Sequence, residues 1–180
     1  MARRKRFATI IWSLVLGAAC AAQAQSSKTS PPCGLETPFR QQDFTIGAWE
    51  VFGKDKAKSS AIVEIKPVLG GCALEEIWTV TDGRPTGNGR GLFTYSRQLG
   101  VWHYLWAADT GSSTEFKGRQ TSPNTLVYET SASTKNGGKR QRRWTLSLEP
   151  DGWVRELSVA SEDEGATWLV EYDLFWRRRP

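Results

Sequence analysis

Apolar residues recur at every second position from Phe44 to near the end of the chain, and this spacing is typical of β-strands rather than helices. Turn residues such as Gly, Pro, Asn and Asp interrupt the alternation at short intervals. The pattern therefore predicts a series of short antiparallel strands. We expect ten of them, over residues 46–53, 60–67, 72–80, 89–96, 101–108, 113–119, 125–132, 141–149, 152–160 and 167–177.

Ten consecutive antiparallel strands with short connections favour a barrel, because closing the sheet removes its two exposed edges. The predicted fold class is all-β, with a single antiparallel up-and-down β-barrel of about ten strands. An outer-membrane barrel needs an uncharged apolar band on its outside. Charged residues such as Glu64, Glu75 and Asp173 fall on both faces of the predicted strands, so we expect a soluble barrel.

Residues 161–168 match the Ser-x-Asp-x-Gly-x-Thr-Trp pattern of the Asp-box, a β-hairpin whose Asp side chain ties down its own turn. Sialidase-type propellers repeat this motif in successive blades of about 40 to 50 residues. Here the motif occurs once, so the sequence excludes a propeller. We interpret the motif as a structural clasp on the last hairpin.

Residues 1–24 have the organisation of a secretory signal peptide, with a basic segment, an apolar segment and Ala22-Gln23-Ala24 as the cleavage site. We expect cleavage near Ala24 and a periplasmic or secreted protein with no transmembrane segment after processing. An uncleaved anchor and a lipoprotein modified at Cys20 are the alternatives. The mature chain then comprises a Ser/Pro-rich arm over residues 25–43 and a barrel domain over residues 44–180.

The signal peptide accounts for most of the basic character of the chain. The full sequence has 24 Lys and Arg against 19 Asp and Glu, and the leader holds four basic residues and no acidic one. The mature chain therefore has 20 basic and 19 acidic residues. A nucleic-acid partner is not expected, because it requires a concentrated basic face. Basic clusters near residues 135–143 and 177–179 are interpreted as a solvated turn and tail, with contact to anionic lipid or polysaccharide as the alternative.

Two cysteines remain after the leader is removed, Cys33 and Cys72. An even pair in an oxidising compartment predicts a disulfide, which would attach the arm to the barrel. Neither residue lies in a Cys-x-x-Cys motif, and the chain has a single histidine, His103. No metal site and no cofactor are therefore expected.

The chain resembles a family of exported bacterial lipocalin-like, calycin-type proteins of unknown function. The resemblance extends over residues 44–179 and is implied by five segments in order: 46–51, 71–78, 102–106, 151–155, and the Asp-box hairpin with Tyr172 and Arg177. It implies a calycin-like antiparallel barrel and brings no established activity or ligand. This chain departs from the family pattern at Tyr104, which lies where Gln is usual between the two tryptophans.

Glu76 is the first candidate for a polar group inside the barrel, because it shares a predicted strand face with Leu74 and Trp78. Arg155 lies on a face with Leu157, so we expect it to point inward as well. A buried Glu76–Arg155 pair could anchor the head group of a ligand. A structural salt bridge and an exposed Glu76 are the alternatives.

Aromatic residues alternate along one predicted strand, with Trp102, Tyr104 and Trp106 on one face and His103 opposite. The stripe could stack on a ligand or simply form core. No catalytic residue is predicted, because a nucleophile motif is missing from the sequence and the glycine-rich residues 87–91 lead into a strand rather than a helix. The candidate ligand-binding residues are Glu76, Trp78, Tyr104, Trp106 and Arg155.

These features favour a protein that binds a small hydrophobic or amphipathic molecule in an aromatic-lined cavity. A second hypothesis is a barrel enzyme of the cyclase or isomerase type that uses a luminal carboxylate. A third is a barrel filled by its own aromatic rings, with a structural or interaction role. Oligomeric state and ligand identity stay open at this stage.

Overall fold

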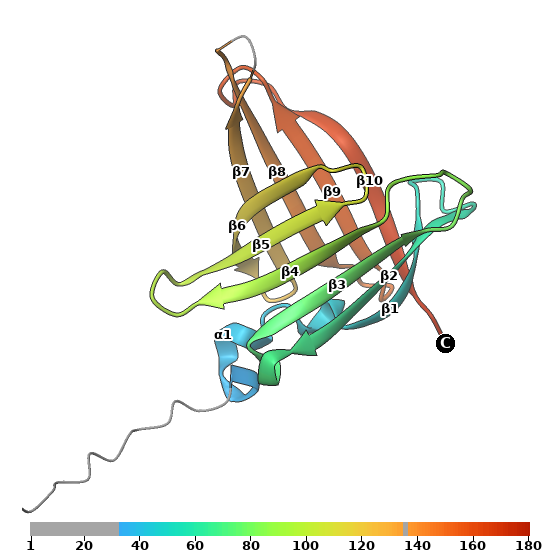
Figure 1. Ribbon diagram of the computed structural model, residues 1–180. Helices are drawn as coiled ribbons and strands as arrows, with labels where there is room; N and C mark the ends of the chain where they lie inside the picture. The colour runs from blue at the N-terminus through green and yellow to red at the C-terminus, as the bar shows by residue number, and fades with distance from the viewer. Residues whose placement is uncertain (1–32, 135–136) are drawn as a thin grey trace, which may run out of the picture. The chain divides into compact units, whose positions relative to one another are not determined.

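The computed structural model describes residues 33–134 and 137–180, so the expected signal peptide and residues 25–32 of the expected arm lie outside the described residues. Ten antiparallel strands close into one barrel, each paired with its neighbours in sequence and β1 paired with β10 (Figure 1). The predicted fold class is confirmed. The strands are β1 (Gly47–Phe52), β2 (Ser59–Val68), β3 (Ala73–Val80), β4 (Gly89–Ser96), β5 (Val101–Ala108), β6 (Ser113–Ser122), β7 (Thr125–Ser133), β8 (Lys139–Leu148), β9 (Val154–Ser161) and β10 (Leu169–Arg178).

The pairing of β1 with β10 closes the barrel, with Trp49 opposite Arg178 and Val51 opposite Trp176. The Arg178 guanidinium lies 4.2 Å from the centre of the Trp49 ring, and Arg177 donates to Glu50 at 2.6 Å. The C-terminal arginines therefore contact β1 across the seam. Backbone pairing, an ion pair and a cation–π contact together hold the first and last strands in register.

Short helical segments lie at one end of the barrel, which we call the closed end (Figure 1). They are η1 (Cys33–Leu35), α1 (Thr37–Arg40) and η2 (Asp43–Thr45), which include the described part of the expected arm, and η3 (Leu69–Gly71) between β2 and β3. Phe39 and Gln42 are buried, and Gln41 accepts a hydrogen bond from the Trp102 indole at 3.0 Å. No helix in the described ranges is long and apolar enough to cross a membrane.

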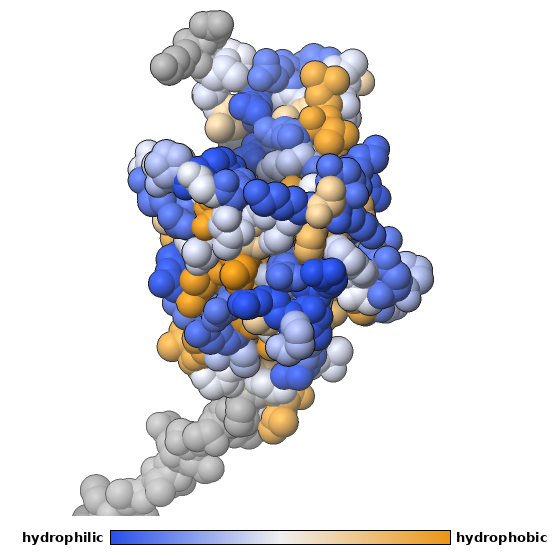
Figure 2. Space-filling model, turned by 90° about the vertical axis from the view of Figure 1, so that its right-hand side faces the viewer, coloured by the Kyte–Doolittle hydropathy of each residue, from blue (hydrophilic) through white to orange (hydrophobic). Residues whose placement is uncertain are grey.

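The side chains alternate between the barrel interior, or lumen, and the outer surface. The buried core consists of inward residues from all ten strands, with Trp49, Trp102 and Trp176 among the largest. On the outer face drawn in Figure 2, hydrophilic residues interleave with separate hydrophobic patches. The lumen is therefore the place where large aromatic surface is removed from water.

The octet 161–168 comprises the last residue of β9 and the connection to β10. Asp163 accepts hydrogen bonds from the Ser161 hydroxyl at 2.7 Å and from the Thr167 backbone N–H at 2.8 Å. The Trp168 indole donates to the carbonyl of Gly165 at 3.1 Å, and Gly165 has a φ of 93°. Hydrogen bonds from Thr167 and Ser161 lower the pKa of Asp163 to about 2. The Asp163 side chain thus organises its own turn, whose glycine adopts a left-handed backbone.

A disulfide joins Cys33 to Cys72, as predicted. Cys33 belongs to η1, and Cys72 directly precedes β3. The bond therefore attaches the helical closed end to the connection between β2 and β3.

The disulfide closes a loop of 39 residues, so its loss should destabilise the fold by about 4 kcal/mol in the chain-entropy model. We expect the Cys33→Ser/Cys72→Ser variant to unfold at lower urea concentration than the wild type, with a near-native circular dichroism spectrum before unfolding. Reductant should shift the wild type toward the variant and leave the variant unchanged. Equal urea midpoints for oxidised wild type and variant would contradict this prediction.

Candidate functional site

Five aromatic rings fill the middle of the lumen, and we call them the aromatic floor: Phe93, Tyr104, Phe116, Tyr128 and Trp144. Ring centres lie 4.1 Å apart for Phe93 and Tyr104, 4.7 Å for Tyr104 and Trp144, and 5.1 Å for Tyr128 and Trp144. Such distances are typical of packed aromatic pairs. The closed-end side of the lumen is thus filled by side chains rather than open to a ligand.

A cavity of about 420 Å³ lies beyond the floor, toward the end opposite α1, which we call the open end. Its rim includes Arg84 and Gly87 between β3 and β4, and Ser112 between β5 and β6. Its walls and base combine aromatic rings with two carboxyl groups. The lining residues are Ser60, Glu76, Trp78, Arg84, Gly87, Tyr104, Trp106, Ser112, Phe116, Arg142, Trp144, Glu156, Tyr172 and Leu174.

Glu76 on β3 lies at the base of this cavity with 2% of its surface exposed. The Tyr104 hydroxyl on β5 donates to Glu76 Oε2 at 2.6 Å. Gly91 on β4 lies between these strands, and a Cβ there would be 2.5 Å from the Tyr104 ring and 2.6 Å from Glu76 Oε2. A glycine at this position is therefore required for the Glu76–Tyr104 contact.

Glu156 on β9 is the second buried carboxyl group, with 6% of its surface exposed. Its two oxygens accept hydrogen bonds from two indoles, Oε1 from Trp144 at 3.0 Å and Oε2 from Trp176 at 2.9 Å. Both donors come from strands adjacent to β9 in the sheet, β8 and β10. Glu156 is thus held rigidly at the cavity wall.

Burial raises the pKa of both carboxyl groups. For Glu76, burial outweighs the hydrogen bond from Tyr104, the charge of Glu156 adds to the effect, and the pKa rises to about 8. For Glu156, hydrogen bonds from Trp176, Trp144 and Tyr172 offset part of the burial effect, and the pKa rises to about 7. Two carboxyl groups that titrate near neutral pH in one cavity are typical of functional sites.

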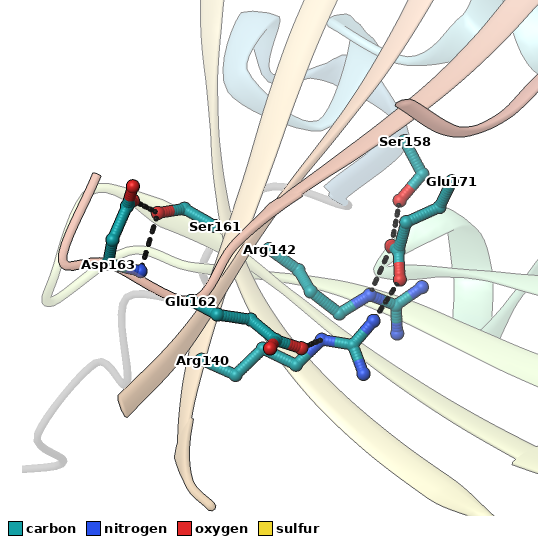
Figure 3. A network of polar contacts seen from close by, with 7 residues as sticks. All are labelled: Arg140, Arg142, Ser158, Ser161, Glu162, Asp163 and Glu171. Carbon is teal, nitrogen blue, oxygen red and sulfur yellow. Dashed lines mark hydrogen bonds and ion pairs between the residues drawn. The ribbon is translucent and has the colours of Figure 1, made fainter. Parts of the chain in front are cut away.

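Arg142 enters the cavity wall from β8, close to a cluster of polar contacts around Glu171 (Figure 3). Glu171 accepts hydrogen bonds from Arg142 at 2.7 Å, from Ser158 at 2.8 Å and from Arg140. Burial alone would raise the pKa of Glu171, but the hydrogen bonds and the arginine charges lower it below its ordinary value. Arg142 was expected in a solvated hairpin tip, and the structure places it against the lumen instead.

The barrel wall opens beside this site. β6 pairs with β5 from Ser113 to Gly118, whereas its pairing with β7 begins only at Lys117. β6 diverges from β7 toward the open end (Figure 1). A groove of about 1150 Å³, lined mainly by residues of β5 to β8, lies there. The groove and the cavity share Phe116 and Arg142 as lining residues, so the two adjoin.

Four of the five candidate residues line the cavity: Glu76, Trp78, Tyr104 and Trp106. Trp78 and Trp106 face each other edge to face with ring centres 6.5 Å apart. Glycine makes room for Trp106 as well, because a Cβ at Gly89 would lie 2.2 Å from its ring. The glycines of β4 thus allow aromatic rings to lie against the backbone.

The prediction that Arg155 faces the lumen is wrong. Arg155 donates to Asp173 on the outer face, with nitrogen–oxygen distances of 2.8 and 2.9 Å, and forms no pair with Glu76. The alternating pattern of β9 was assigned to the wrong face, because Leu157 beside Arg155 is apolar although it faces outward. The inward position next to Arg155 belongs to Glu156.

The last strand also departs from strict alternation. A β-bulge between Val170 and Tyr172 shifts the register with β9. Strict alternation would place Val170 on the same face as Tyr172 and Leu174, but Val170 is 65% exposed, and Glu171 contacts the lumen side instead. A bulge inserts one residue into one strand, so it exchanges the faces on either side of it.

Glu156 was missed although the sequence contains a signal for it. The turn residues 150–152 favour a short β8–β9 connection, which places Leu146 opposite Glu156. Residues directly opposite in an antiparallel pair lie on one face. An inward Leu146 therefore implies an inward Glu156.

Comparison with known proteins does not extend this description, because no family model and no curated protein matches the chain.

The pKa of Glu76 implies that the stability of the fold depends on pH. The carboxyl titrates near pH 4.5 in the unfolded chain and near pH 8 when folded, so the folded state binds more protons between these values. The free energy of unfolding should therefore fall as pH rises through this window, by up to about 4 kcal/mol. We expect Glu76→Gln to remove this part of the fall, as measured by urea unfolding between about pH 5 and about pH 8.

Glu50→Gln is the matched control, because Glu50 lies on the outer face and pairs with Arg177. The free energy of unfolding of Glu50→Gln should change with pH in the same way as that of the wild type. The same pH dependence in Glu76→Gln and wild type would refute the assignment of a raised pKa to Glu76.

Proposed function

We propose that this protein is an exported, lipocalin-like barrel that binds one small amphipathic molecule in the open-end cavity. The observation that carries the proposal is the cavity of about 420 Å³, with aromatic walls and two buried carboxyl groups. Ligand sites in proteins are concave and mostly apolar, with a few polar groups that fix orientation. Glu76 and Glu156 would supply those polar groups, and Trp78 and Trp106 the apolar walls.

The cavity volume favours this proposal over a filled barrel. The aromatic floor fills the closed-end side, whereas the open-end volume exceeds the roughly 300 Å³ at which ligand pockets begin. Burying carboxyl groups also costs free energy without a partner, so a purely structural lumen would be better filled with apolar side chains.

Export is supported by the basic and apolar organisation of residues 1–24 and by the disulfide between Cys33 and Cys72, since disulfides persist in oxidising compartments. Membership of the lipocalin-like family is supported by the five sequence segments and by the closed antiparallel barrel. In this proposal the octet 161–168 is an Asp-box hairpin with a structural role.

The Leu174→Trp variant tests ligand binding, because Leu174 lines the cavity and a larger ring there would occupy its volume. We expect the variant to bind the neutral fluorescent probe N-phenyl-1-naphthylamine at least roughly tenfold more weakly than the wild type. Leu92→Trp on the outer face of β4 adds the same ring outside the lumen and should bind normally. Protein for this test is purified from the periplasmic fraction, where its mass also shows whether the chain starts at Gln25.

A probe that binds both variants and the wild type equally, or that does not bind the wild type, would contradict a ligand-binding lumen.

One observation favours an enzyme as the second candidate. Glu76 combines a raised pKa with a tyrosine hydroxyl 2.6 Å away, and this arrangement suits a group that exchanges protons with a substrate. A barrel cyclase or isomerase would use it on a bound molecule.

Native mass spectrometry of the periplasmic protein in D₂O distinguishes an enzyme from a binder. An enzyme should incorporate deuterium at carbon atoms of the co-purified molecule, and Glu76→Gln should stop the incorporation. A binder should release the molecule with its carbon-bound hydrogens unchanged.

A further inference from the structure

The two buried carboxyl groups of the cavity lack a cationic partner in the part of the chain that the structure describes. Glu76 accepts a hydrogen bond from the Tyr104 hydroxyl, and Glu156 accepts hydrogen bonds from two indoles. All three donors are neutral. Burying an ionised carboxylate without an opposite charge costs several kcal/mol. The positive charge that would balance the site is therefore a property to expect of the ligand, provided that the proposed ligand-binding function holds.

The hydrogen bonds indicate which carboxyl group carries the negative charge. An indole N–H only donates, so a protonated Glu156 would have to place its proton on an oxygen that already accepts from Trp144 or Trp176. A tyrosine hydroxyl both donates and accepts, so Glu76 can keep its proton and still bond to Tyr104. Glu156 is thus the anion of the pair, and Glu76 is the neutral partner.

The cations on the cavity lining are already engaged. Arg142 donates to Glu171 at 2.7 Å, and Arg84 at the rim donates to Asp82 at 2.9 Å. Neither arginine is among the groups that shift the pKa of Glu156, which burial raises and its hydrogen bonds lower. The negative charge of Glu156 is therefore not cancelled by either of them.

The walls around this charge are aromatic. Trp78, Trp106 and Trp144 line the same cavity as Glu156, and Trp78 and Trp106 are partly exposed to it. The faces of tryptophan rings attract organic cations, more strongly when the cation is removed from water. A carboxylate in the wall of an aromatic cavity thus combines two attractions for the same kind of ligand group.

We propose that the ligand is a small organic ammonium compound, a protonated amine with an apolar body, whose cationic nitrogen binds Glu156 while the body lies against Trp78 and Trp106. Binding then follows the ionisation of the carboxyl pair. A cation favours the ionised forms of Glu156 and Glu76, so binding near neutral pH releases protons and strengthens as pH rises. A neutral acceptor group would instead need a protonated carboxyl and would bind more weakly as pH rises.

Other charged and titratable groups face the pair from the surrounding strands. Tyr104, Tyr128 and Tyr172 have pKa values raised further above their ordinary range by burial, so they stay neutral in this pH range. Glu171 has a lowered pKa and stays ionised with its arginines. The groups that face the pair are Tyr104 on β5, Tyr128 on β7, Arg142 on β8, Glu171 and Tyr172 on β10, and Arg84 at the rim.

Three probes with one skeleton test the charge preference: 2-phenylethylamine as cation, 2-phenylethanol as neutral analogue and phenylacetate as anion. For each probe we measure how well it displaces N-phenyl-1-naphthylamine from the wild-type protein at about pH 7.5. The amine is also titrated by calorimetry in phosphate and in Tris buffer, which reports proton release. We expect the amine to bind roughly tenfold more tightly than the alcohol, and phenylacetate most weakly. The calorimetry should show proton release, and the affinity for the amine should increase between about pH 6 and about pH 8.

Glu156→Gln keeps the shape of the side chain and should reduce the preference for the amine over the alcohol to less than about twofold. Glu50→Gln on the outer face should keep the wild-type preference. If Glu156→Gln does not fold, the wild-type protein still tests the inference, through the pH dependence of its affinity for the amine and the protons released on binding.

The results separate this inference from the proposed function. The ammonium assignment is wrong, while the ligand-binding cavity stands, in any of three cases. These are that the alcohol displaces the naphthylamine as well as the amine does, that neither displaces it, or that affinity for the amine falls as pH rises. If Leu174→Trp leaves naphthylamine binding unchanged, the proposed function itself fails, and the inference fails with it.

Discussion

Closure of the sheet by β1 and β10 is the constraint on which the rest of this structure depends. Once Trp49 lies opposite Arg178, every strand has two neighbours, and each residue is committed to the lumen or to the outer surface. Backbone groups that would form exposed edges are paired instead. A single antiparallel ring of ten strands also encloses more volume than a small core needs, so the fold creates an interior that must be filled or used.

One part of the barrel interior is filled by side chains, and the other part is left open as a cavity. Five packed rings form a solid floor, and the disulfide-linked helical segment covers the closed end, so the packing there resembles an ordinary core. Toward the open end the rings form walls rather than filling, and the cavity retains Glu76 and Glu156. Burial of carboxyl groups beside unfilled volume is costly for a structural barrel, and it is the physical reason to regard the open-end cavity as a site.

Several parts of the site could be read from residue order and spacing alone. Trp102, Tyr104 and Trp106 share a face in any strand, and the two cysteines outside the expected leader made a disulfide the simplest pairing. Residue spacing alone does not show which face of a strand points inward, because an alternating pattern is compatible with either face inside the barrel. On β9 the outward face carries Leu157 and looks like core, so Arg155 was placed inside and Glu156 was overlooked.

The sequence by itself determined the class of fold, the number and approximate bounds of the strands, and the disulfide, because period-two alternation, turn residues and cysteine count are local properties. The tertiary structure decided what faces the lumen and how much space is left there. The bulge before Tyr172, the room that Gly91 leaves for Tyr104, and the two indoles that converge on Glu156 all depend on pairing between separate strands. Cross-strand register sets these contacts, and the alternation along a single strand does not fix it.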